Sequence, residues 1–252
     1  MSPRTQLTMR YINCASRMAV NLFKTTMGLT ALANYKVFSF DKITSTQTYA
    51  HEMIARGDAA DHTAIVALAQ SAGRGRYKRS WVSHHGNLYV SFIFNVTERD
   101  PRLSYAVAVA IADTIASFGI KPTIKWPNDI LIDGKKVSGT LIEYSGRFVI
   151  IGIGINIKSN PTVENYETTK LEKYADVERL ELLSRLMKNL DKWMRADFRA
   201  VRARWNDMAA CLNSTVKYQG ASAELLGINE NGALVLRRGS QYLLVYGDEI
   251  TM

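Results

Sequence analysis

The chain has 252 residues, of which 47% are hydrophobic, so it can bury the core of one large domain with at most a small second one. Its formal net charge of +9 predicts an anionic partner, but does not choose between nucleic acid, a membrane surface, a nucleotide and an acidic protein. Its two cysteines lie far apart without metal-type spacing, so neither a disulfide framework nor a zinc site is indicated. The longest apolar run, at 148–157, is too short to span a membrane. We therefore expect a soluble, cytoplasmic protein.

Residues 1–34 form an N-terminal extension that contains basic residues and no acidic one. A mitochondrial transit peptide has this composition, but a disordered leader or a translation start upstream of Met27 explains it equally well. We favour an extension without a targeting role.

From residue 35 onward, strand-like and helix-like patterns alternate. Runs of β-branched and aromatic residues predict strands at 35–40, 63–70, 87–96, 123–126, 137–144 and 147–155. Hydroxyl caps or Pro101 at the start, and Gly57 or Gly119 at the end, predict helices within 45–57 and 101–119. The pattern is that of an α+β fold, with a β-sheet backed by helices.

Between Val177 and about Met208, apolar residues recur every three or four positions, which predicts a long amphipathic helix or a bent pair. The basic residues on its other face are expected to be solvated rather than to bind nucleic acid. Short strands separated by glycine-rich turns follow Asn213 and predict a small β-barrel. The expected domains are therefore 35–210 and 213–252.

The stretch GRGRYKRSW, at 73–81, places four cationic side chains between two predicted strands. No acidic residue occurs from His62 to Thr97, so these cations have no local partner and predict an anionic ligand. Glycines 73 and 75 let the backbone approach that ligand, and arginine matches carboxylate and phosphate oxygens. The dinucleotide fingerprint and the P-loop are both excluded, because their remaining residues are missing. A loop that tracks a nucleic-acid backbone remains the competing interpretation.

A second polar stretch is KWPNDILIDGKKVSGTLIEY, at 125–144. Asp129 is suited to hold magnesium or to orient a base, although an ordinary Asn-Asp turn explains the same residues. DGKK predicts a hairpin turn, which places Lys136 at the start of a strand and Gly139 inside it. GIGIN, which ends at Asn156, is a second strand punctuated by glycine.

Five motifs, in order and spacing, resemble those of the biotin protein ligases, biotin–[acetyl-CoA-carboxylase] ligases. They are STQ at 45–47, QSAGRGR at 70–76, KWPNDI at 125–130, KKVSGTLIE at 135–143 and GIGINI at 152–157. Residues 223–238 and 247–250 are similar to the family's C-terminal SH3-like domain. The resemblance implies a mixed β-sheet backed by helices, of the class II aminoacyl-tRNA-synthetase-like kind, followed by a small SH3-like β-barrel.

The family makes biotinoyl-5′-AMP from biotin and ATP, and then transfers biotin to a lysine of a biotin carboxyl carrier protein. By similarity, the catalytic residues would be Lys136, Arg74, Arg76 and Asp129, the last with a Mg²⁺ ion. The biotin-binding residues would be Ser45, Thr46, Gln70, Gly73, Arg74, Lys136 and Gly139. ATP would be bound by Arg76, Trp126, Asn128 and Asn156. Asp129 is also our candidate for the base that deprotonates the acceptor lysine.

The chain departs from the family pattern in two places. The family's loop often continues with Arg-Gly after the second arginine, where this chain has Tyr77-Lys78, so loop closure is expected to differ. Residues 1–34 are too few for the winged-helix domain of the bifunctional members, so we expect no DNA binding. Membrane binding is not expected, and a homodimer would be in keeping with the family.

Three rival interpretations differ in activity. A lipoate protein ligase shares the fold and the adenylation chemistry, but the pairing of GRGR with KWPND argues against it. A basic nucleic-acid-binding module would bind in a strongly salt-dependent way. A non-catalytic biotin sensor is disfavoured because Lys136, Arg74 and Arg76 are all present.

Overall fold

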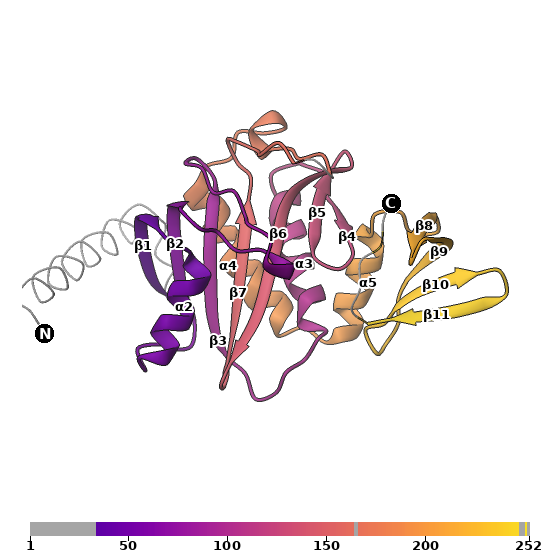
Figure 1. Ribbon diagram of the computed structural model, residues 1–252, viewed down its shortest axis with the longest axis horizontal. Coiled ribbons are helices and arrows are strands. Elements are labelled where there is room, and N and C mark those ends of the chain that lie inside the picture. The colour runs from indigo at the N-terminus through magenta and orange to yellow at the C-terminus, as the bar shows by residue number, and fades with distance from the viewer. Residues whose placement is uncertain (1–33, 164–165, 247–249, 251–252) are drawn as a thin grey trace, which may run out of the picture. The chain divides into compact units, whose positions relative to one another are not determined.

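The structure is a computed structural model that describes residues 34–163, 166–246 and 250 (Figure 1). Its strands form a seven-stranded mixed sheet in the order β1-β2-β3-β7-β6-β5-β4 and a four-stranded sheet in the order β11-β10-β9-β8. The strands are β1 (Lys36–Ile43), β2 (Thr63–Gln70), β3 (Leu88–Asn95), β4 (Thr123–Lys125), β5 (Asp129–Ile132), β6 (Lys135–Ser145), β7 (Phe148–Ile155), β8 (Thr215–Tyr218), β9 (Ala221–Ile228), β10 (Leu234–Arg238) and β11 (Gln241–Val245). The helices are α2 (Thr46–Ala55), α3 (Leu103–Ala116), α4 (Arg179–Met194) and α5 (Phe198–Met208), with short 3-10 turns at Arg76–Lys78 and Leu171–Lys173.

Two compact units make up the chain. The first comprises the chain up to Glu98, with Leu141–Ser159 and Glu178–Ser184; the second comprises Arg99–Thr140, Asn160–Val177 and Arg185–Met252. Strand β6 begins in the second unit and ends in the first.

In the first unit, α2 packs against β2, β3 and β7 (Figure 1). Strand β1 runs parallel to β2, whereas β2–β3 and β3–β7 pair antiparallel. The apolar side of α2, formed by Ala50 and Met53, buries Ile65, Ile93 and Ile150 beneath it. This packing fixes the N-terminus of α2, where the Ser45 side chain caps the helix, over β2 and β3.

In the second unit, β4, β5 and β6 form antiparallel pairs, and α3 packs against β4, β5 and α5. Helix α3 is almost wholly buried, which suits its alanine- and valine-rich sequence. Its one carboxylate, Asp113, is paired with Arg204 and accepts a hydrogen bond from Trp193 Nε1 at 2.9 Å. Asp113 therefore joins α3 to both α4 and α5.

The C-terminal sheet is an antiparallel meander of β8, β9, β10 and β11. The side chain of Asn206, at the end of α5, joins this sheet to α5, because its Oδ1 accepts a hydrogen bond from the backbone N–H of Ile228 at 2.9 Å. Gly227 leaves room for that side chain: its φ is +115°, and a Cβ there would lie 2.6 Å from Asn206 Oδ1. A separate small sheet is thus present, and its closure into a barrel stays a prediction.

The expected α+β architecture, a mixed sheet with helices packed on it, is confirmed. The region 177–208 is the bent pair rather than one helix, because Asp197 caps α5 and accepts from the backbone N–H of Arg199. Strand β5 is not among the strands that the sequence patterns predict. The domain boundaries stay predictions, and residues 1–33 of the extension lie outside the described residues. In the described part of the chain, no helix is both long and apolar enough to cross a membrane.

Candidate functional site

The basic stretch 73–81 folds back on itself in the connection between β2 and β3. Its two limbs are joined by backbone bonds from Trp81 N–H to the Gly73 carbonyl at 2.9 Å and from Gly75 N–H to the Arg79 carbonyl at 2.8 Å. The limbs also pair at Arg74 and Ser80. The stretch is therefore a hairpin-like loop, which we call the basic loop.

At the tip of the basic loop, two consecutive residues without the freedom of glycine have left-handed backbone angles. Tyr77 has a φ of +53° and Lys78 a φ of +59°. The Arg76 guanidinium lies over the Tyr77 ring at 4.9 Å and donates to its hydroxyl at 3.0 Å. Lys78 is the position at which the sequence departs from the family's glycine, so the departure coincides with a conformation that favours glycine.

Replacing Lys78 by glycine should therefore stabilise the protein relative to replacement by alanine. Left-handed φ costs a residue with a Cβ about 1–2 kcal/mol, and the unfolded-chain entropy of glycine offsets about half of that. We expect Lys78→Gly to have a free energy of unfolding about 0.5–1 kcal/mol higher than Lys78→Ala in urea titrations. Equal stability of the two variants would show that the loop adopts another conformation in solution.

A polar network surrounds the N-terminus of α2. Gln70 Oε1, at the end of β2, accepts from the Thr46 backbone N–H at 2.8 Å and from Thr46 Oγ1 at 3.2 Å. Gln70 Nε2 donates to Ser83 Oγ at 2.8 Å, and Ser91 Oγ donates to Thr46 Oγ1 at 2.8 Å. Ser45, Thr46 and Ser91 are all buried. The structure thus brings together three residues expected to bind biotin, namely Ser45, Thr46 and Gln70.

Gly73 lies against the same network. A Cβ at Gly73 would be 2.3 Å from the Trp81 carbonyl oxygen, 2.6 Å from Ser83 Oγ and 3.1 Å from Gln70 Nε2. No larger residue fits there without moving backbone. Gly73 is therefore the point at which the basic loop joins the polar network.

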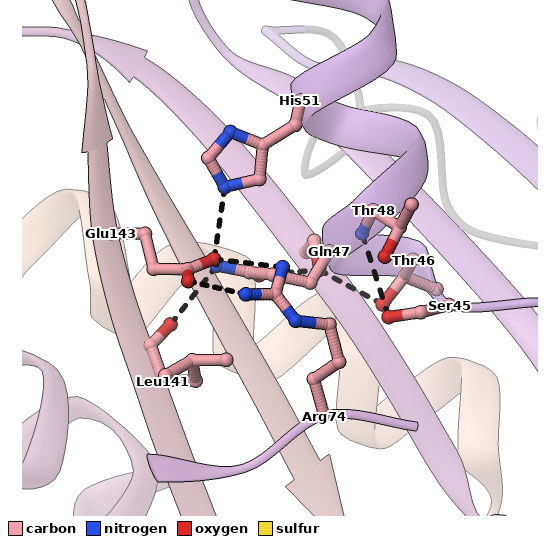
Figure 2. Close-up of polar contacts among 9 residues, drawn as sticks. Ser45, Thr46, Gln47, Thr48, His51, Arg74, Leu141 and Glu143 are labelled. Carbon is pink, nitrogen blue, oxygen red and sulfur yellow. Dashed lines mark hydrogen bonds and ion pairs between the residues drawn. The ribbon is translucent and has the colours of Figure 1, made fainter. Parts of the chain in front are cut away.

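Glu143, near the end of β6, receives hydrogen bonds from three sides (Figure 2). Arg74 binds it with both ends of its guanidinium, Nη2 to Oε1 at 2.7 Å and Nη1 to Oε2 at 3.2 Å. Gln47 Nε2 and His51 Nε2, both from α2, each lie 2.9 Å from Oε2. We call these four residues the Glu143 cluster. One carboxylate thus connects the basic loop, α2 and β6.

Burial opposes ionisation of Glu143, but the hydrogen bonds from His51 and Gln47 and the charge of Arg74 outweigh it, so the pKa of Glu143 is lower than usual. A lowered pKa in the folded state stabilises the protein above the unfolded value, about 4.3 for glutamate, and that stabilisation is lost as the pH falls through the folded pKa. We expect Glu143→Gln to be less stable than the parent at pH 7, and the difference to shrink on acidification below about pH 4. Urea titrations at several pH values measure this; a difference that is constant with pH would contradict it.

A second charged pair lies at the other end of β6. Lys136 Nζ is 2.7 Å from Asp129 Oδ1, with side chains only 15% and 23% exposed, so both charges are largely shielded from water. The hairpin between β5 and β6 creates this pair, and it also pairs Asp129 with Gly139 across the two strands. Asn128 Nδ2 donates to the Thr140 carbonyl at 2.7 Å. Lys136 and Gly139 thus lie on a strand after a hairpin turn, as the sequence predicted, and the structure adds Asp129, on β5, and Asn128, just before it, to the same neighbourhood.

Asp129 was also the expected magnesium ligand. In the described part of the chain, no three His, Cys, Asp or Glu side chains converge on a point that could hold a metal. Magnesium commonly binds through one or two carboxylates plus substrate phosphates, so a single carboxylate fits an ion that arrives with ATP rather than a protein-built cage.

Two expected ATP ligands are buried. Trp126 is 3% exposed, and its Nε1 donates to the Tyr105 hydroxyl at 3.1 Å inside the second unit. Burial raises the pKa of Tyr105, and the Trp126 hydrogen bond opposes it. Asn156 is 1% exposed at the end of β7. Their roles in ATP binding remain predictions.

The sequence interpretation did not single out Gln47, His51, Ser91 or Glu143 as site residues. Gln47 and Glu143 lie inside the quoted motifs STQ and KKVSGTLIE, so the motifs carried a signal for them. Ser91 lies in an apolar run, and His51 is one polar position of an amphipathic helix. Only the packing of α2 on the sheet brings these two side chains to the site.

The chain matches a known class of protein. Residues 39–160 match the Biotin/lipoate A/B protein ligase family. The solved structure of biotin protein ligase from Aquifex aeolicus in complex with biotin and ATP superposes with a TM-score of 0.73 at 28% identity, covering 86% of this chain and 97% of that one.

Two curated relatives show that, within this class, the chain is similar to biotin ligases. The bifunctional ligase/repressor BirA of Bacillus subtilis is 32% identical over 236 residues, which are 84% of this chain and 72% of that protein. The biotin–[acetyl-CoA-carboxylase] ligase of Paracoccus denitrificans is 31% identical over 199 residues, which are 69% of this chain and 83% of that protein. The chain belongs to the biotin protein ligase family.

Proposed function

We propose that this protein is an ATP-dependent ligase that activates biotin as biotinoyl-5′-AMP and transfers it to a lysine of a biotin carboxyl carrier protein. The observation that carries the proposal is the similarity to the Aquifex aeolicus enzyme, which was solved with biotin and ATP and which this chain covers almost completely. The five ordered motifs from Ser45 to Ile157 support the same activity.

In the first step, a biotin carboxylate oxygen attacks the α-phosphorus of ATP, and pyrophosphate leaves with the electrons of the broken P–O bond. Both reactants are anions, so positive charge must lower their repulsion in the transition state. Lys136, Arg74 and Arg76 supply that charge in the proposal. Magnesium bound to the phosphates, with Asp129 as its protein ligand, would neutralise the remainder.

The biotin ring head would bind at the N-terminus of α2. Its ureido group offers N–H donors and a carbonyl acceptor, which hydroxyl and amide side chains complement. Ser45, Thr46 and Gln70 supply these groups in one buried network. Gly73 and Gly139 would let the backbone lie close to the valeryl tail.

In the second step, a neutral lysine amine of the carrier attacks the carbonyl carbon of the mixed anhydride, and AMP leaves. The amine must lose a proton, and Asp129 is the proposed acceptor. Transfer from preformed biotinoyl-5′-AMP should therefore be slowed in Asp129→Asn. Undiminished transfer would exclude this role.

A homodimer, as in other family members, is part of the proposal.

Isotope exchange between pyrophosphate and ATP tests the proposal most directly. Exchange should require magnesium and biotin, and lipoate or no acid should not support it. Addition of a carrier-protein fragment should then yield a biotinylated lysine detectable by mass. Exchange driven by lipoate would make the protein a lipoate ligase, and no exchange with either acid would favour a binding protein.

A further inference from the structure

The Glu143 cluster contains Arg74, which the proposed reaction uses, yet no step of that reaction needs a second carboxylate near an anionic substrate. An additional negative charge would repel the carboxylate of biotin and the phosphates of ATP. It is tolerated only if another group neutralises it. In the Glu143 cluster, Arg74 does so through a two-point contact of 2.7 and 3.2 Å.

We propose that Glu143 is a positioning residue for Arg74: it fixes the guanidinium so that the remaining N–H groups face the carboxylate of biotin and the adenylate phosphate. The inference rests on the proposed function, in which Arg74 contacts those anions. A guanidinium has five N–H donors in a rigid fork, and the contact with Glu143 uses one on each terminal nitrogen, which leaves Nε–H and two others.

Arg74 needs such a fixed anchor because of where it lies. Glycine stands on either side of it in the basic loop, and its side chain is 41% exposed. An arginine in that setting would otherwise sample many rotamers, and binding would have to immobilise it. A flexible side chain that is ordered before the ligand arrives binds more tightly.

Glu143 can provide the anchor because it is itself held. Gln47 and His51 donate to Oε2 from α2, and Gln47 Oε1 in turn lies 3.0 Å from the buried Ser91 hydroxyl, whose one proton it shares with Thr46 Oγ1. The Glu143 side chain is 25% exposed. Figure 2 shows His51 and Gln47 reaching Glu143 from the helix, while Arg74 approaches from the loop. The carboxylate is thus tied to a helix and a strand, and Arg74 is the exposed loop residue that it fixes.

A double-mutant cycle in the biotin-dependent exchange reaction tests the inference. Arg74→Ala, Glu143→Gln and the double variant are compared with the parent for KM of biotin and for kcat. Glu143→Gln is expected to raise KM for biotin about three- to tenfold, the cost of immobilising one flexible side chain, with little change in kcat. In the Arg74→Ala background, Glu143→Gln should no longer raise KM, and should lower it if anything, because it then removes a negative charge that no longer has Arg74 to neutralise it.

His51→Ala serves as the milder second variant, and remains informative if Glu143→Gln folds poorly. It should raise KM for biotin about twofold to threefold, and only when Arg74 is present. His85→Ala is the matched control, because that histidine is exposed and lies outside the Glu143 cluster. It should change nothing.

Three outcomes would overturn the inference. A lower KM in Glu143→Gln would mean that Glu143 competes with the substrate for Arg74. Equal effects with and without Arg74 would mean a general structural role. An unchanged KM would mean that Arg74 needs no anchor. Absence of biotin-dependent exchange in the parent protein would overturn the proposed function as well, so the two failures are distinguishable.

Discussion

Lys136→Met is expected to reduce biotin-dependent pyrophosphate exchange by about 100-fold or more, because removal of one charged group that stabilises a developing anion typically costs that much. Methionine retains the length of the aliphatic chain and removes only the ammonium. The Lys136 ammonium is held at 2.7 Å from Asp129 and is mostly buried, so it is fixed before the substrates bind. A fixed charge in a shielded site stabilises a transition state more than a mobile surface charge does.

The adjacent lysine provides the matched control for this variant. Lys135 is 40% exposed and forms an ion pair with Glu167, away from Asp129. Successive side chains of a strand point to opposite faces, so Lys135 and Lys136 differ in direction although they are neighbours in sequence. Lys135→Met should retain nearly full exchange activity.

Stability must be measured in parallel, because Lys136→Met leaves Asp129 without its partner. Loss of one member of a shielded ion pair destabilises a protein, and the melting temperature of the variant reports this. A folded variant with normal exchange would remove Lys136 from the reaction. Equal losses in both lysine variants would point to overall charge instead of a particular ammonium group.

The α+β architecture and most of the strands could be predicted, because these segments have strong local signals. Buried strands such as β3 are nearly continuous apolar runs. Helix α2 begins at the Ser45 cap and α3 shortly after Pro101, and a glycine with positive φ follows each helix, Gly57 and Gly119. Strand β5 was missed because Asp129–Ile132 has only four residues, and an Asn-Asp turn explains its start equally well. The break between α4 and α5 depends on Asp197, a cap that the apolar period does not reveal.

The candidate site was predicted less completely than the fold. Arg74 lies in a loop of unusual charge, and Lys136 and Asp129 lie in motifs that resemble those of the biotin protein ligases, so the sequence draws attention to them. The contact between Arg74 and Glu143 joins residues 69 positions apart, and that between His51 and Glu143 joins residues 92 apart. Such contacts arise from tertiary packing, and no periodicity in a single sequence encodes them.

Gly73→Ala is expected to weaken biotin binding and to destabilise the fold, whereas Gly75→Ala should do neither. The added methyl group at position 73 would meet the Trp81 carbonyl oxygen at 2.3 Å, which is shorter than any real contact of a Cβ atom. That oxygen belongs to the backbone, and the Trp81 N–H donates a hydrogen bond to the Gly73 carbonyl. The two limbs of the basic loop must therefore separate to make room for the methyl group. Overpacking of this kind costs about 1–3 kcal/mol.

The effect on binding follows from the other two atoms near Gly73. Ser83 Oγ and Gln70 Nε2 would lie 2.6 and 3.1 Å from the new methyl group, and Gln70 Nε2 donates a hydrogen bond to Ser83 Oγ at 2.8 Å. Displacing Gln70 disturbs its contacts with Thr46, and through them the proposed site for the biotin ring head. KM for biotin should therefore rise about tenfold or more, as expected when a hydrogen-bonding group for a polar ligand is misplaced.

Comparison with Gly75→Ala separates the effect of steric overlap at position 73 from the effect of losing the backbone freedom of a glycine. The Gly75 backbone is extended, with φ −122° and ψ −177°, and a Cβ at Gly75 would lie 3.3 Å from its nearest obstacle, the Arg79 carbonyl oxygen. Alanine can adopt that conformation with a shift of a few tenths of an ångström. Urea titration and biotin kinetics of both variants decide the matter. Equal tolerance of alanine at 73 and 75 would show that the basic loop is not packed against Gln70 in solution, and equal damage would show that the loop needs backbone freedom at both glycines.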